Sequence, residues 1–224
     1  MCGRFSDRFT WKELHDLANI LFTQGDGASV WTPKFNIAPT TQIPVIRFID
    51  GARRIDMMRW GLVAAWSKEI SKIPMHNARA DGCAEKPTFR GAWKAGRRCI
   101  IPASSFFEWR KSDKQPFAIG LGNGGLMGFA GLWEEWQPKN GGPPVLSCTI
   151  ITTEPNTLVA PIHDRMPVIL GEENWGTWLG EEPATQEALH ALLAPLPAER
   201  MTVWQVSKDV GNVKNQGESL ADPV

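Results

Sequence analysis

Tyrosine is absent from this 224-residue chain, and histidine and cysteine occur only four times each. The four cysteines, Cys2, Cys83, Cys99 and Cys148, show no CxxC spacing, and the histidines are scattered. Neither a disulfide framework nor a zinc site is therefore indicated. We expect a monomer of the reducing cytoplasm that holds no metal and no cofactor.

Long apolar runs are missing too, since none approaches the roughly 18 to 20 residues needed to cross a bilayer. We expect no membrane partner. The net charge gives no indication of a charged partner, because the chain has 24 basic residues (Lys and Arg) and 24 acidic residues (Asp and Glu). Locally, bases dominate residues 86–114 and acids gather in residues 172–187. This asymmetry is typical of a protein that binds phosphates on one face. It is equally typical of a basic face that is only solvated.

Short apolar or β-branched segments between Gly, Pro and Asn make up most of the chain. They predict strands at residues 42–48, 54–60, 98–101, 106–109, 116–120, 127–133, 146–152 and 201–206. Helical spacing predicts amphipathic helices over residues 11–22 and from about Thr185. Because strands follow strands, we expect an α+β fold of mainly antiparallel β-sheets in a compact barrel-like core with peripheral helices, forming a single domain over residues 1–224.

Two motif matches are rejected. Gly120 to Gly125 fits GxGxxG, but a strand follows where a dinucleotide site needs a helix, and Asn123-Gly124 predicts a hairpin turn. Ser104-Ser105 lacks the glycine flanks of a nucleophile elbow. His15 and His190 fall in predicted helices, where we expect surface positions.

Cys2 becomes an N-terminal 1,2-aminothiol if Met1 is removed. Its α-amine, with a pKa of about 7.7 to 8.0, is neutral a few hundredfold more often at pH 7 than a lysine with a pKa of about 10.4. Such a group condenses with an aldehyde through the amine and then closes a five-membered ring through sulfur. The alternative is a cysteine that stands at the terminus by chance.

Glu108 lies among aromatic side chains in a predicted strand, on the face shared with Phe106, while Phe107 and Trp109 take the other face. Desolvation there would raise the carboxyl pKa toward the range of general acid–base catalysis. A glutamate on a water-facing strand edge is the alternative.

Polar groups also gather in two further segments. Residues 162–167 place His163 beside a carboxylate and Arg165 in a loop, where His163 suits proton transfer or is incidental to an Asp–Arg pair. Asn77 and Arg79 combine an amide that can orient a carbonyl or hydroxyl with a guanidinium suited to phosphate. Residues 35–39 predict a tight turn that places Pro39 against a flat ligand.

Seven segments in this order resemble the SOS response-associated peptidase (SRAP) family of abasic-site processing proteins. They are Met-Cys-Gly-Arg-Phe at the start, Phe35 to Pro39, Trp60 to Leu62, Asn77 to Arg79, Phe106 to Trp109, Ile162 to Pro167 and Gly211 to Gly217. The resemblance implies capture of abasic sites in single-stranded DNA by the N-terminal cysteine, through a Schiff base and then a thiazolidine crosslink. It also implies associated lyase activity and a cytoplasmic protein that joins the nucleoid when bound to DNA.

The same resemblance assigns residue roles. Cys2 is the nucleophile, Asn77 orients the opened sugar, Glu108 is the acid–base group beside the amine, and His163 donates a proton to the sugar oxygen. Residues expected to line the DNA groove are Arg4, Asn36, Pro39, Trp66, Arg79, Trp109 and Arg165. A basic residue that some relatives carry about ten positions after Arg79 has no clear match, and Lys86 or Arg90 could replace it.

Two other classes of function stay open. A thiol peptidase using Cys2 and His163, able to remove its own leader, would turn over peptides without DNA. A single-stranded DNA-binding module with a passive Cys2 would bind without a covalent product.

Overall fold

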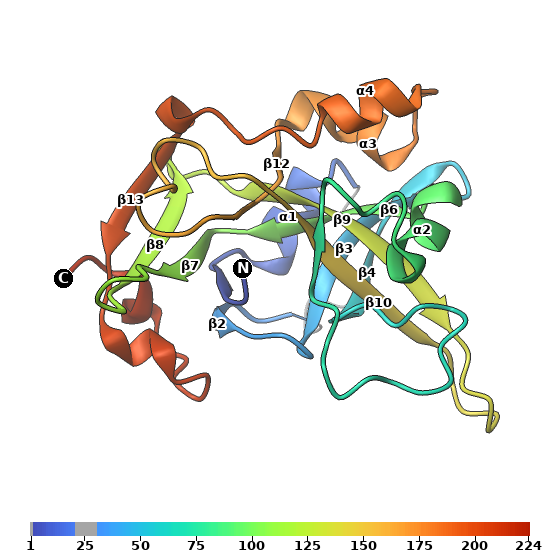
Figure 1. The fold of residues 1–224 in the computed structure, drawn as a ribbon, viewed down its shortest axis with the longest axis horizontal. Helices are drawn as coiled ribbons and strands as arrows, with labels where there is room; N and C mark the ends of the chain where they lie inside the picture. Colours follow the sequence, from blue (N-terminus) through green and yellow to red (C-terminus); the bar gives the residue numbers. More distant parts are fainter. Residues whose placement is uncertain (1, 21–30) are drawn as a thin grey trace.

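A closed ring of five strands forms the centre of the computed structural model, which describes residues 2–20 and 31–224. The ring contains β3 (Gln42–Ile49), β4 (Ala52–Trp60), β6 (Arg98–Ala103), β9 (Met127–Trp136) and β10 (Val145–Thr153). The neighbours β3–β4, β3–β6, β6–β9 and β9–β10 pair antiparallel, and a parallel pairing of β10 with β4 closes the ring (Figure 1). This confirms the predicted α+β fold with a barrel-like core.

A second, antiparallel sheet lies beside the barrel (Figure 1). Its order is β13 (Met201–Gln205), β8 (Pro116–Leu121), β7 (Ser105–Trp109), β1 (Phe5–Asp7) and β2 (Lys34–Ile37). In β7 the side chains alternate between two layers: Phe106 packs in the main core, whereas Phe107 packs with Val206 and Val210 in a smaller cluster.

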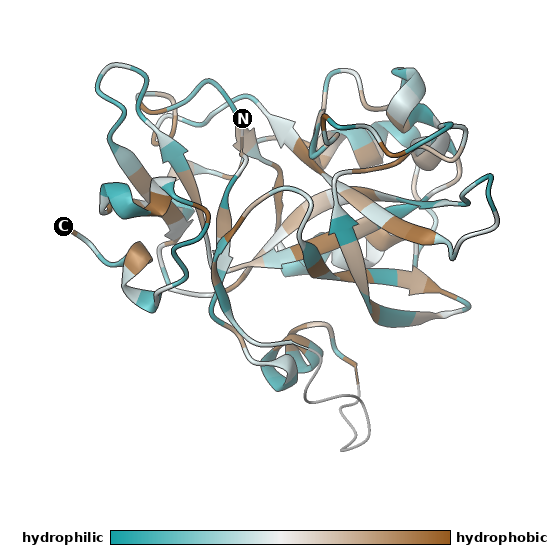
Figure 2. Cartoon of the chain, turned by 90° about the horizontal axis from the view of Figure 1, so that it is seen from below, coloured by the Kyte–Doolittle hydropathy of each residue, from teal (hydrophilic) through white to brown (hydrophobic). Residues whose placement is uncertain are grey.

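Short elements complete the fold. The strands β5 (Asn77–Arg79) and β11 (Met166–Pro167) pair with β10, and β12 (Ile169–Leu170) pairs with β9. The helices are α1 (Trp11–Leu17), α2 (Pro87–Lys94), α3 (Trp175–Leu179) and α4 (Gln186–Ala191). Four 3₁₀ segments of the described chain are η1 (Glu172–Asn174), η2 (Ala198–Arg200), η3 (Lys208–Gly211) and η4 (Glu218–Ala221). Hydrophobic and hydrophilic residues alternate along many strands (Figure 2), as sheets with one buried face require.

All eight predicted strands form, with ends that differ by a few residues. The first helix is shorter than predicted, since Asn19 adopts a φ of 55° and the Ile20 amide donates to the His15 carbonyl at 2.9 Å. This left-handed cap ends the helix. Residues 21 and 22 of that prediction lie outside the described part of the chain. His15 was expected at the surface, but it is buried against Trp11, with ring centroids 5.2 Å apart.

Two turn predictions are only partly correct. Residues 34–37 form β2 because they pair with β1, so the turn begins only at Ala38, whose carbonyl accepts from Thr41. A turn does form at Asn123-Gly124, but β8 and β9 on either side of it belong to different sheets and make no hairpin. The strand after these glycines confirms that GxGxxG is not a dinucleotide fingerprint here.

Candidate active site around Cys2

Cys2 belongs to the main core and lies three residues before the start of β1. Antiparallel pairing of β1 with β7 sets Phe5 opposite Phe106, which brings the residues before Phe5 level with Glu108. The Cys2 side chain is 0% exposed, so it lies in the core rather than at an open terminus. Burial, followed by the nearby charge of Glu108, raises the pKa of the Cys2 thiol well above its ordinary value. The thiol is therefore neutral at physiological pH.

Glu108 is a buried carboxyl, as its aromatic neighbours predicted, with 3% of its surface exposed. Burial raises its pKa to about 7. A carboxyl with this pKa can both accept and donate a proton near neutrality, which is the property that a general acid–base group needs.

Asn77 connects the start of the chain to the barrel. It lies on β5, opposite Ile150 of β10, and its Nδ2 donates to the Cys2 carbonyl at 2.8 Å. Its Oδ1 is buried and has no hydrogen-bond partner among the described residues. Because buried acceptors are normally satisfied, this oxygen is suited to receive a hydrogen bond from a bound substrate.

His163 comes from the loop that precedes β11. Its Nε2 lies 3.9 Å from Glu108 Oε2, and its Nδ1 lies 3.0 Å from the backbone N of Arg165. The Arg165 carbonyl lies 3.2 Å from the same Nδ1, so Nδ1 either accepts from the Arg165 amide or donates to the Arg165 carbonyl, depending on the ring tautomer. Burial lowers the pKa of His163, although Asp164 Oδ1 at 3.1 Å from Nδ1 opposes this shift. Cys2, Asn77, Glu108 and His163 together form the Cys2 cluster.

Charged side chains surround this cluster in pairs. Arg79 donates to Asp81 through Nε at 3.0 Å and Nη2 at 2.7 Å, and Arg165 Nη2 lies 3.5 Å from the same carboxylate. Lys111 Nζ lies 3.1 Å from Asp164 Oδ2. The sequence predicted both arginines but missed Asp81, although its position two residues after Arg79 at the end of a strand places both on one face.

Arg4, Asn36 and Trp109 form a second group. The Arg4 guanidinium lies 5.7 Å from the Trp109 ring centroid and donates to Asn36 Oδ1 at 2.8 Å. Asn36 is 2% exposed, and its Nδ2 lies within 3.2 Å of three backbone carbonyls, those of Val210, Asn212 and Asn215. The Asn36 side chain therefore anchors residues 210–215 and presents no amide at the surface.

Replacing Asn36 with alanine is expected to lower the free energy of unfolding by about 2 to 4 kcal/mol, because the half-buried Arg4 guanidinium loses one of its two acceptors and three backbone carbonyls lose a donor. Urea denaturation measures this. Asn123→Ala is the matched control, since Asn123 makes one exposed bond to the Gly125 amide and should change stability by less than about 1 kcal/mol. Equal effects of the two substitutions would contradict the anchoring role.

The remaining expected groove residues lie at the surface or near it. Pro39 is half-buried in the turn after β2. Trp66 is 67% exposed, and its Nε1 donates to the Pro87 carbonyl at the start of α2 at 3.2 Å. Lys86 and Arg90, the two possible phosphate contacts, are also exposed, one residue before and three residues after Pro87.

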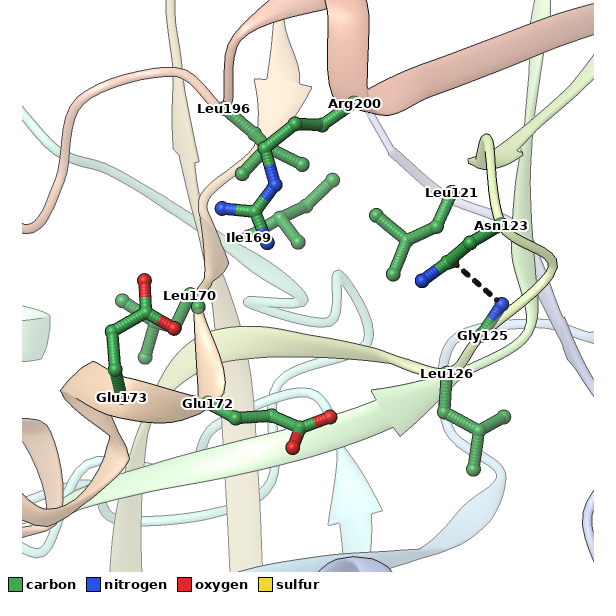
Figure 3. Close-up of a pocket in the computed structure, with 11 residues that line it drawn as sticks. Leu121, Asn123, Gly125, Leu126, Ile169, Leu170, Glu172, Glu173, Leu196 and Arg200 are labelled. Atoms are coloured by element: carbon green, nitrogen blue, oxygen red, sulfur yellow. Dashed lines mark hydrogen bonds between the residues drawn. The ribbon is translucent and has the colours of Figure 1, made fainter.

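A cavity of about 290 Å³ occurs elsewhere, between the Gly120 to Gly125 turn and the segment after β12. Figure 3 shows Glu172 and Glu173 on one side of it and Arg200 on the other. No member of the Cys2 cluster lines it.

The described residues contain no group of three or more His, Cys, Asp or Glu side chains able to hold a metal ion. Within the same residues, no helix is both long and apolar enough to cross a membrane.

Known proteins resemble this chain over its whole length. An abasic site processing protein of Bacillus subtilis, YoaM, is 40% identical over 99% of this chain and 98% of its own. The abasic site processing protein YedK of Escherichia coli is 31% identical over 100% of both chains. Abasic site processing protein HMCES of Xenopus tropicalis is 32% identical over 96% of this chain and 76% of its own.

A crystal structure of a Bacteroides thetaiotaomicron protein superimposes with a TM-score of 0.88, at 25% identity and with all of both chains covered. The family model described as SOS response associated peptidase (SRAP) matches residues 1–213. The chain belongs to the SRAP family.

Proposed function

We propose that this chain processes abasic sites in single-stranded DNA by covalent capture at Cys2. One observation carries the proposal: the Cys2 backbone, the Asn77 amide, the Glu108 carboxyl and the His163 ring meet at one buried place, although they come from four separate segments. The relatives named as abasic site processing proteins support the choice of substrate.

The reaction requires no cofactor. With Met1 removed, the Cys2 amine adds to the aldehyde of the ring-opened sugar, and loss of water gives an imine. The thiol then adds across the carbon–nitrogen double bond and closes a thiazolidine, so that the thiol proton ends on nitrogen. β-Elimination from the imine would cleave the strand, and it competes with ring closure.

Glu108, His163 and Asn77 are suited to different steps of this reaction. Glu108, with a pKa of about 7, would take the proton that keeps the amine unreactive and return it to the departing water. His163 would donate a ring proton to the sugar ring oxygen and open the hemiacetal. Asn77 would hold the opened sugar through its buried Oδ1.

A thiol peptidase fits the site less well. Such enzymes attack with a thiolate, which neighbouring positive charge stabilises. Here burial and the Glu108 carboxylate both raise the pKa of the Cys2 thiol. Aminothiol condensation instead begins at the amine and needs no preformed thiolate.

A denaturing gel tests the proposal against both rivals. Protein mixed with single-stranded DNA containing an abasic site should give a heat-stable shifted band, whereas intact DNA and borohydride-reduced abasic DNA should give none. Peptide hydrolysis without DNA would favour the peptidase. Binding without any covalent band would favour the non-covalent module.

Non-covalent affinity for single-stranded DNA should also depend on salt. The logarithm of the affinity is expected to fall with the logarithm of salt concentration, with a slope of about −0.7 per phosphate neutralised. Arg79→Ala and Arg165→Ala should each flatten this slope, while Arg54→Ala, near the start of β4, should not. Fluorescence anisotropy measures the affinity at each salt concentration. A wild-type slope near zero would show that phosphate contacts do not contribute to binding.

A further inference from the structure

Asp81 occupies the position between two arginines that a backbone phosphate would take. Its two oxygens receive both N–H groups on one edge of Arg79, and Oδ2 also lies 3.5 Å from Arg165 Nη2. A carboxylate and a phosphate present matching oxygen pairs to a guanidinium, and arginine binds either in this bidentate way. We propose that Asp81 is an internal competitor of the DNA backbone, which holds the two arginines in the free protein and weakens binding to undamaged strands.

The exposures of the three side chains permit this exchange. Asp81 is 58% and Arg79 52% exposed, so incoming phosphate can reach their contact, whereas Arg165 is only 15% exposed and keeps its place. Hydrogen bonds from Arg79 lower the pKa of the Asp81 carboxyl, so it stays charged at neutral pH. An exposed pair of this kind is weak enough for a phosphate to displace it.

The neighbouring pair has the same arrangement. Lys111 lies against Asp164, so a second base beside the Cys2 cluster is also matched by an acid. Charge around the cluster is thus balanced locally, in keeping with a chain whose bases and acids both total 24. Weak non-covalent binding would leave discrimination to the covalent step, which only an aldehyde completes.

The inference rests on the proposed function, and Asp81→Asn tests it. The substitution keeps the shape of the side chain and removes its charge. Affinity for an intact single-stranded oligonucleotide should rise about three- to tenfold at low salt, because no carboxylate has to be displaced from Arg79. The log–log salt slope should become more negative, because the wild-type carboxylate takes up a counterion when phosphate displaces it and asparagine does not. Fluorescence anisotropy over a salt series measures both values.

Asp50→Asn is the matched control for net charge. Asp50 also pairs with an arginine, Arg54, and is exposed on the β3–β4 turn. The length of β4 places this turn about 25 Å from Trp60, whose indole bonds to the His76 carbonyl next to Asn77. Asp50→Asn and the charge-preserving Asp81→Glu should both bind within about twofold of wild type.

A double variant separates competition from a structural effect. In an Arg79→Ala background, Asp81→Asn should lose most of its gain, because its main partner is gone. Weaker binding by Asp81→Asn would instead mean that Asp81 pre-positions the arginines, and it would overturn the proposal. If Asp81→Asn and Asp50→Asn raised the affinity for DNA equally, the change in net charge alone would explain the result. The proposal would then be overturned.

Crosslinking of wild-type protein to abasic DNA is measured on the same preparations. If wild type crosslinks and binds with a negative salt slope while Asp81→Asn brings no gain, only the role of Asp81 fails. If wild type shows neither property, the proposed function fails and the role of Asp81 fails with it.

Discussion

Cys2→Ala is expected to abolish the heat-stable crosslink to abasic single-stranded DNA. The substitution removes the sulfur that closes the thiazolidine, while the α-amine remains once Met1 is removed. An imine should therefore still form and be trapped by borohydride, and strand cleavage by β-elimination should persist or increase because ring closure no longer competes with it. Denaturing gels with and without borohydride separate these outcomes, and the intact mass of each protein establishes that Met1 is absent.

Because Cys2 is buried, Cys2→Ala can lower the stability of the fold, and the experiment needs a control for that loss. The sequence indicated a side chain at a terminus, but the thiol is 0% exposed in the main core. Its removal is expected to lower stability by about 1 kcal/mol. Cys83→Ala is the matched control, since Cys83 is also a free, 0% exposed cysteine and lies outside the Cys2 cluster. It should lose similar stability and crosslink normally. Undiminished heat-stable crosslinking by Cys2→Ala would contradict the thiazolidine mechanism.

The sequence predicted the barrel strands well because each combines β-branched or apolar residues with a clear turn signal at its ends. The short strands β1, β2 and β5 were missed, since three or four residues carry too little periodicity. They exist because β1 pairs with β7, β2 pairs with β1 and β5 pairs with β10, which satisfies their backbone groups. Helix α2 was also missed, although Pro87 at its first turn is a common start signal.

Site residues were predicted unevenly for a similar reason. Side-chain chemistry in a local motif marked Cys2, Asn77, Glu108 and His163, and their meeting depends on long-range pairing that no local pattern contains. Asn36 had an amide in a suggestive motif, yet its bonds go to residues more than 170 positions later in the chain. Contacts over such separations become visible only in the folded chain.

Glu108→Gln is expected to slow crosslinking by about 10² to 10⁴, the usual contribution of a positioned acid–base group. The amide keeps the size of the side chain but cannot take a proton from the amine. Single-turnover capture of abasic DNA measures the rate. His163→Ala provides the comparison: it should slow capture of the natural sugar more than capture of a substrate with a permanently open aldehyde, whereas Glu108→Gln should slow both. Equal slowing of both aldehydes by His163→Ala would remove the ring-opening role.

Glu108→Gln should raise the free energy of unfolding at pH 8 while it lowers the crosslinking rate. These opposite effects separate a catalytic role of Glu108 from a structural one. Burial raises the folded-state pKa to about 7, above the ordinary value near 4.3. The protonated form is therefore favoured by folding, and its contribution to stability is complete below pH about 4.3 and is lost as pH rises through 7. Glutamine stays neutral, so Glu108→Gln should exceed wild type in unfolding free energy by roughly 2 to 3 kcal/mol at pH 8 and by little at pH 5. A slower and less stable variant at pH 8 would instead show that the ionised carboxylate holds the site together.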